Sequence, residues 1–165
     1  MRSTLGSILS QLVDASFLFV GNFIGTDVTG LLDKGNAQFG IEIDNSSGNQ
    51  IGGSTVAERN VISGNSVGIS IIADELPASD NTIQGNYIGT DVSGNQRLGV
   101  GANVMIRGNA SNNRLGTNAD GVSDELERNV IAGRTDNTTG VLHLESSTGN
   151  WVAGNYIGVG ADGTT

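Results

Sequence analysis

The chain contains a long internal repeat. Residues 21–30 (GNFIGTDVTG) return at 85–94 as GNYIGTDVSG, and a shortened copy, GNYIG, follows at 154–158. The copies begin 64 residues apart (21 to 85) and 69 residues apart (85 to 154). Self-similarity at a regular spacing is typical of proteins in which similar structural units stack on one another. The repeat therefore restricts the chain to a stacked architecture.

Three short patterns recur within this repeat, and each predicts a β-strand. The first is Asn-x-apolar, and it starts at Asn49, Asn81, Asn113 and Asn150. The second also begins with asparagine, at Asn22, Asn60, Asn86, Asn129 and Asn155. The third has apolar residues at alternate positions, in 41–43, 69–71, 104–106 and 142–144. Alternation of this kind is typical of a strand with one face in a core.

The spacing of the first pattern predicts how these strands are arranged. Its members lie 32, 32 and 37 residues apart (49 to 81, 81 to 113, 113 to 150), and each interval holds one strand of every pattern. The remaining residues form long loops. These follow the strand of the first pattern in one coil and the strand of the second pattern in the next, so one copy of the long repeat covers two coils. A strand that returns in register lies parallel to its predecessor, about 4.8 Å away. We therefore predict an all-β solenoid of about five coils with three short parallel sheets.

Composition supports this fold and excludes several others. The 165 residues include 26 glycines, 18 asparagines, one proline and no cysteine. Each glycine inside a helix costs about 1 kcal/mol relative to alanine, so long helices are disfavoured. The absence of a Gly-X-Y period excludes collagen, and the absence of cysteine excludes a disulfide scaffold. Asparagine and glycine suit tight turns, and an asparagine amide can bond to the next coil.

Three segments resemble a known family. Residues 86–91 (NYIGTD), 49–55 (NQIGGST) and 59–65 (RNVISGN) are similar to bacterial right-handed parallel β-helix repeat proteins of the pectate-lyase-like superfold. The resemblance covers roughly residues 17 to 158. It implies a right-handed helix and a secreted or cell-surface location. It implies no single function, because the superfold includes lyases, hydrolases, epimerases, adhesins and scaffolds.

The N-terminus departs from the strand patterns. Its apolar residues fall on one face of a helix: Leu5, Ile8, Leu9, Leu12 and Val13. We predict an amphipathic helix within residues 1–16 that caps the β-helix of residues 17–165, because a solenoid needs its first coil covered. A degenerate first coil is the alternative. Gln11 and Asp14 interrupt the apolar stretch, so it is not typical of a signal peptide.

One histidine gives the only candidate for general acid–base catalysis. His143 occupies an outward position between Leu142 and Leu144, with Met105 and Ser70 as its expected neighbours on adjacent strands. Glu145 is the nearest candidate partner, although Arg107 is expected to form a surface ion pair with it. We expect no catalytic site unless these side chains lie in a cleft. No cofactor is predicted.

An acidic loop is the candidate metal site. Its four carboxylates are Asp120, Asp124, Glu125 and Glu127. Carboxylate oxygens are ligands that Ca²⁺ prefers. The loop lacks the spacing of known calcium motifs, so a solvated acidic loop is the favoured interpretation and no metal is predicted.

Outward positions of the second pattern form an apolar row. The row consists of Phe23, Val61, Tyr87, Val130 and Tyr156. Beside it runs a row of small residues, which consists of Gly25, Ser63, Gly89, Ala132 and Gly158. Either the long loops cover this face with Leu31, Leu32 and Leu98, or the face is a contact surface for protein or sugar rings.

Charge and the last coil indicate the partner. The net charge is -9, with one lysine and seven scattered arginines, so neither nucleic acid nor an anionic membrane is an expected partner.

The last coil has the strands of Trp151 and Tyr156 but no third strand, which leaves an open end. We predict a homodimer, tail to tail or along the apolar row. The predicted function is a non-catalytic module binding protein or carbohydrate; the alternative is a carbohydrate-active enzyme.

Overall fold

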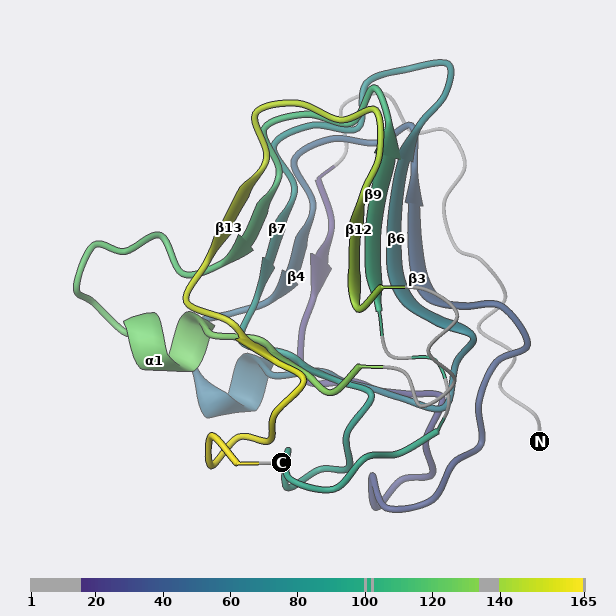
Figure 1. Ribbon diagram of the computed structural model, residues 1–165, viewed down its shortest axis with the longest axis vertical. Coiled ribbons are helices and arrows are strands. Elements are labelled where there is room, and N and C mark those ends of the chain that lie inside the picture. The colour runs from purple at the N-terminus through teal and green to yellow at the C-terminus, as the bar shows by residue number, and fades with distance from the viewer. Residues whose placement is uncertain (1–15, 100, 102, 134–139, 165) are drawn as a thin grey trace.

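The computed structural model describes residues 16–99, 101, 103–133 and 140–164 (Figure 1). These residues are mostly β, with the short α-helix α1 (Asp124–Glu127) and the 3-10 helix η1 (Val56–Glu58) as the helical elements. The expected capping helix and its alternative, a degenerate coil, fall on residues 1–15 and lie outside the described residues.

The strands form three sheets, and all paired strands are parallel. The first sheet contains β1 (Leu18–Phe19), β4 (Gln50–Gly52), β7 (Thr82–Gln84), β10 (Arg114–Gly116) and β13 (Trp151–Ala153). The second contains β2 (Phe23–Ile24), β5 (Val61–Ile62), β8 (Tyr87–Ile88), β11 (Val130–Ile131) and β14 (Tyr156–Ile157). The third contains β3 (Phe39–Asp44), β6 (Val67–Ala73), β9 (Val104–Gly108) and β12 (Leu142–Leu144). The chain visits the three sheets in turn, and we call one such passage a circuit.

Each strand expected from the sequence patterns is present in the structure. The first and second patterns begin one residue before their strands, because each asparagine occupies the corner that leads into the strand. Strand β1 was not predicted as a member of the first sheet. Its corner residue is Phe17 instead of asparagine, and Phe17 still donates its backbone N–H to Asn49 Oδ1 (3.1 Å).

The core lies between the three sheets and consists almost entirely of aliphatic side chains. Fully buried residues in register include Ile51, Ile83 and Leu115 of the first sheet. The second sheet contributes Ile62, Ile88 and Ile131. Burying one such side chain stabilises a fold by about 1.5–3 kcal/mol.

Asparagine side chains form hydrogen-bonded ladders at two corners. In the ladder before the second sheet, Asn86 Oδ1 accepts from Asn60 Nδ2 (2.9 Å), and Asn86 Nδ2 donates to Asn129 Oδ1 (3.0 Å). The ladder before the first sheet follows the same pattern through Asn49, Asn81, Asn113 and Asn150. The donor always belongs to the earlier circuit, so both ladders have one direction.

A glycine on the neighbouring strand makes room for the ladder. A Cβ atom at Gly52 would lie 2.5 Å from Asn86 Oδ1, and one at Gly116 would lie 2.7 Å from Asn155 Nδ2. Both glycines also have positive φ angles, which side-chain-bearing residues rarely adopt. Glycine and asparagine are therefore required together at these corners.

Long loops follow the second sheet in alternate circuits, as the two-circuit repeat predicts. The loops after β2 and β8 stack directly, since Val92 N–H donates to the Gly30 carbonyl (3.0 Å). The segment after β14 continues the stack, since Ala161 N–H donates to the Gly94 carbonyl (3.0 Å). These loops lie at the lower edge of the view in Figure 1.

We expect Asn86→Ala to lower the free energy of unfolding by about 3 kcal/mol, because several buried hydrogen-bonding groups would lose their partner. Asn86 is fully buried and also donates to the Ile51 and Gln84 carbonyls (both 2.9 Å). Urea unfolding measures the effect. Asn22→Ala, at the exposed start of the same ladder, is the control and should cost less than about 1 kcal/mol. Equal losses would contradict the proposed role of the ladder.

Candidate functional site

The final circuit leaves core positions open to solvent. Val152 is in register with the buried Leu115, yet it is 37% exposed. Ile157 is in register with the buried Ile131 and is 42% exposed. β12, β13 and β14 are the terminal strands of their sheets, so within the described residues one edge of each of these strands is unpaired. The exposed aliphatic residues and the strand edges therefore lie at the same end of the sheets, the end at which Figure 1 shows β12 and β13.

The opposite end of the molecule differs. Ile41 and Ile43 of β3 occupy core positions in the first strand of the third sheet, and they are 8% and 4% exposed. In β12, the last strand of the third sheet, the core position Leu144 is 46% exposed, although it pairs with the buried Ile106. The open apolar surface of the third sheet is therefore confined to one end.

The apolar row on the second sheet is mostly covered. Val61 and Val130 are each 3% exposed, so they cannot contact a partner in this conformation. Phe23 remains exposed, and Tyr87 and Tyr156 are half-buried. The expected contact surface therefore fails at its two valines.

Glycine residues of the loops lie against two aromatic rings of this face. A Cβ atom at Gly30 would lie 2.7 Å from the Phe23 ring, and one at Gly94 would lie 2.7 Å from the Tyr87 ring. Leu31 and Leu32 are both more than half exposed, so the expectation that they act as lids is wrong, whereas the third expected lid, Leu98, is half-buried. Glycine allows the loop backbone to lie directly against each ring.

Two arginines occupy faces of the tyrosine rings. The guanidinium carbon of Arg59 lies 4.2 Å from the Tyr87 ring centroid, and that of Arg128 lies 4.2 Å from the Tyr156 ring centroid. Each arginine Nε also donates to a carbonyl of the next circuit, that of Gly85 or Gly154. These cation–π contacts were not predicted from the sequence. An arginine one circuit before each tyrosine is the signal that could have revealed them.

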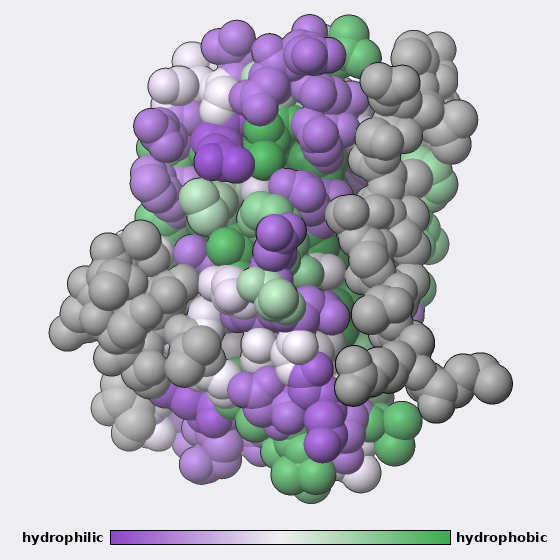
Figure 2. Space-filling view, turned by 90° about the vertical axis from the view of Figure 1, so that its right-hand side faces the viewer, coloured by the Kyte–Doolittle hydropathy of each residue, from purple (hydrophilic) through white to green (hydrophobic). Residues whose placement is uncertain are grey.

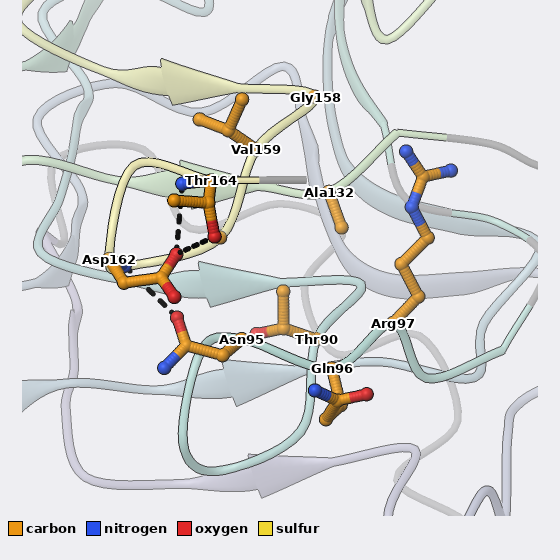
Figure 3. Close-up of a pocket in the computed structure, with 10 residues that line it drawn as sticks. Thr90, Asn95, Gln96, Arg97, Ala132, Gly158, Val159, Asp162 and Thr164 are labelled. Carbon is orange, nitrogen blue, oxygen red and sulfur yellow. Dashed lines mark hydrogen bonds between the residues drawn. The ribbon is translucent and has the colours of Figure 1, made fainter.

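A hollow lies between two of the stacked loops. We call it the loop hollow; it has a volume of about 500 Å³ and is lined by Asn95, Gln96, Arg97, Ala132, Asp162 and Thr164, among others. Figure 3 shows Asn95 and Asp162 on one side and Arg97 on the other, with Ala132 and Thr90 between them. Its floor is Ala132, from the row of small residues that the sequence predicts beside the apolar row.

Hydrogen bonds fix the acidic side of the loop hollow. Asp162 Oδ1 accepts from both the backbone N–H and the hydroxyl of Thr164 (2.9 Å each). These bonds lower the pKa of Asp162 below its ordinary value, so its carboxylate is charged at neutral pH. Asn95 Oδ1 accepts from the Asp162 backbone N–H (3.0 Å), which ties the two loops together.

The outer face of the third sheet carries the candidate catalytic residues. His143 pairs in register with Met105, and Met105 pairs with Ser70, as predicted. His143 Nε2 lies 3.7 Å from Glu145 Oε2, and both side chains are exposed. The expected ion pair of Arg107 with Glu145 is wrong, because Glu145 pairs with His143 instead.

A carboxylate on the first strand of this sheet has a shifted pKa. The pKa of Glu42 is raised, because burial and the nearby Asp44 disfavour its charge, against the opposing effect of Arg107.

Figure 2 views the molecule from the side of the third sheet and shows a mixture of polar and apolar residues on the surface. No extended apolar patch crosses the described part of this view.

Residues of the acidic loop bond mainly within the loop. Asp120 accepts from Val122 N–H (2.7 Å), and Asp124 accepts from the Thr117 hydroxyl. Glu127 is buried and lies 3.5 Å from the Arg114 guanidinium. Together with Glu125 they do not form a metal-binding group, since the described ranges hold no cluster of three or more His, Asp or Glu side chains suited to an ion.

Comparisons with known proteins add no functional evidence. The chain matches no protein-family model, and no curated protein and no solved structure matches it either. Within the described residues, no helix is long and apolar enough to span a membrane.

We expect Gly94→Ala to destabilise the protein more than Gly121→Ala. Both glycines have positive φ angles, of 78° and 82°, so both changes incur a cost of about 1–2 kcal/mol. Only at Gly94 would the new Cβ also contact Tyr87 and the Ala161 Cβ (2.8 Å); at Gly121 nothing lies within 4 Å. The extra cost is about 1–3 kcal/mol. Urea midpoints measure it, and equal midpoints would show that the loop does not hold the ring.

Proposed function

We propose that residues 17–165 form a right-handed parallel β-helix that acts as a non-catalytic interaction module, with a second copy of the chain as its partner. Three parallel sheets visited in turn by a repeating sequence support the helix. Right-handedness rests on the resemblance to bacterial β-helix repeat proteins and on the strong preference of parallel crossovers for that hand.

The exposure of Val152 and Ile157 carries the proposal of self-association. These side chains occupy positions that are fully buried in the preceding circuit. Exposed core residues beside unpaired strand edges form a surface that natural proteins normally cover. A second copy would cover both at once, because its own final circuit offers the same aliphatic residues and strand edges.

Two-fold symmetry gives a closed dimer. In a tail-to-tail arrangement each final circuit covers the other, and no open surface is left to extend the assembly. The alternative contact along the second sheet has less support, because Val61 and Val130 are buried there. The exposed Trp151 lies on β13 beside the open end and would border the tail-to-tail contact.

The alternative function is a carbohydrate-active enzyme, and one observation favours it. The 3.7 Å approach of His143 to Glu145 supplies an imidazole and a carboxylate that could transfer a proton together. The non-catalytic function is preferred because both side chains are exposed, with His143 on the terminal strand β12 and Glu145 just after it, where nothing described encloses a substrate. A net charge of -9 also argues against nucleic acid and anionic membranes as partners.

We expect the wild-type chain to elute at twice the mass of one chain in size exclusion with light scattering, and Val152→Glu to elute as a monomer. A charge at this position would be buried without a partner in the dimer, whereas Val152 is already exposed in a single chain. Trp151→Asp should also split the dimer. Val122→Glu, in the exposed acidic loop, is the matched control and should stay dimeric. A wild-type monomer at all concentrations would refute self-association.

A second assay separates the two functions. The wild-type chain is incubated with neutral and acidic polysaccharides, with and without calcium, and new reducing or unsaturated ends are measured. We expect none. Release of such ends, abolished by His143→Ala, would replace the non-catalytic function with the enzymatic one.

A further inference from the structure

Arginine and glycine alternate at the corner that precedes the second sheet. The residue before each ladder asparagine of this corner is, in the order of the circuits, Gly21, Arg59, Gly85, Arg128 and Gly154. Arg59 and Arg128 are therefore two circuits apart, and we call them the arginine pair. At Gly85, between them, a Cβ atom would lie 2.3 Å from the Gly53 carbonyl oxygen, so no side chain fits at that position.

Both members of the arginine pair are held in the same way. Each guanidinium lies over a tyrosine ring of the next circuit, with the same centroid distance of 4.2 Å. Each Nε donates to a backbone carbonyl of that circuit, at 3.1 Å for Arg59 and 2.8 Å for Arg128. The two rings are in register with Val130 between them, so the guanidiniums are separated by about 9.6 Å, twice the strand spacing. Arg59 has a circuit on either side and the same geometry as Arg128, so this arrangement does not depend on the final circuit.

The arginine pair has no counter-ion in the described part of the chain. Acidic residues outnumber lysine and arginine by 17 to 8, yet the terminal guanidinium nitrogens of the pair form no hydrogen bond or ion pair with a described residue. A glutamate directly precedes each arginine, but Glu58 accepts a hydrogen bond from Thr55, and Glu127 lies 3.5 Å from Arg114. The pair therefore presents two positive charges that these neighbouring carboxylates do not neutralise.

The terminal nitrogens of the arginine pair are open to solvent. Among the described residues, the buried side-chain nitrogens and oxygens without a partner are Ser70 Oγ, Asn103 Oδ1 and Arg107 Nε, so the terminal nitrogens of the pair are not buried. A guanidinium binds a carboxylate through two parallel hydrogen bonds, and only the Nε donor of each arginine is already used. Because the ring contact and the Nε bond fix each guanidinium plane, little freedom is lost when a carboxylate binds.

We infer that the arginine pair binds a linear dicarboxylate, with one carboxylate on each guanidinium. Extended chains of about eight or nine carbon atoms, as in suberate and azelate, place their terminal carboxylates about 9–10 Å apart, which matches the spacing of the pair. One exposed ion pair contributes little, so the gain comes from holding the second carboxylate close to the second guanidinium. We expect a dissociation constant of about 1 mM.

This inference goes beyond the proposed function, because it concerns one chain and not the contact between two copies. The arginine pair lies at the corner before the second sheet, whereas the proposed dimer contact is formed by the exposed core residues Val152 and Ile157. A monomer that binds suberate would refute the dimer and leave this site intact. A dimer that binds no dicarboxylate would refute the site and leave the dimer intact.

The test is an NMR titration of the full chain that follows the Nε–H signals of the arginine pair. The ligands are the dicarboxylates succinate, adipate, suberate and azelate, with octanoate as the monocarboxylate control. We expect affinity to rise with ligand length, and suberate or azelate to bind at least about tenfold more tightly than succinate or octanoate, because only the longer dicarboxylates reach both guanidiniums. Equal affinities of succinate and suberate, or no binding by any dicarboxylate, would overturn the inference.

Variants test the two anchors separately. Arg59→Gln and Arg128→Gln should each weaken suberate binding about tenfold, to the level of octanoate. The matched control is Arg97→Gln, which removes the same charge from an exposed loop residue and should leave the affinity unchanged. Equal weakening by this control would overturn the inference, because it would show a response to net charge alone. The comparison of ligands uses the wild-type chain, so it decides the question even if an arginine variant does not fold.

Discussion

Hydrogen bonds between asparagine side chains are the interactions on which this structure depends. Every strand in the first two sheets has only two or three residues, so each forms few backbone hydrogen bonds. The ladder of Asn86 and its equivalents adds side-chain bonds at one corner of every circuit, and the ladder before the first sheet adds a second corner from the second circuit onward. Because the amides are buried, any shift in register would leave donors and acceptors without partners. The ladders therefore fix the register that the short strands alone would not.

Fixed corners allow the loops to vary. The same backbone bridge closes the loop at Thr26 and the loop at Thr90, although their side chains differ in polarity and charge. The strands and their asparagine corners stabilise the core, whereas the side chains that differ in polarity and charge lie in the loops after the second sheet. This separation is the usual relation between a rigid scaffold and its variable loops.

Sequence patterns predicted the strands well because asparagine, glycine and alternate aliphatic residues obey local rules. β1 was missed because Phe17 stands where those rules expect asparagine. The site was less predictable. The burial of Val61 was not predicted, and the loop hollow is lined by Arg97 and Asp162, which are far apart in the chain. Such features depend on how the circuits stack, which no single segment encodes.

The alternation of loops has a consequence for how such a chain can change in length. The long loops after the second sheet occur in every second circuit. Each loop therefore has about 9.6 Å of space along the stacking direction, which is twice the strand spacing. Removal or insertion of a single circuit would bring two long loops to about 4.8 Å from each other and force one of them out of the stack. Recombination is therefore tolerated in units of two circuits. The 64-residue spacing of the sequence (21 to 85) is the smallest module that the architecture can copy without rebuilding its surface.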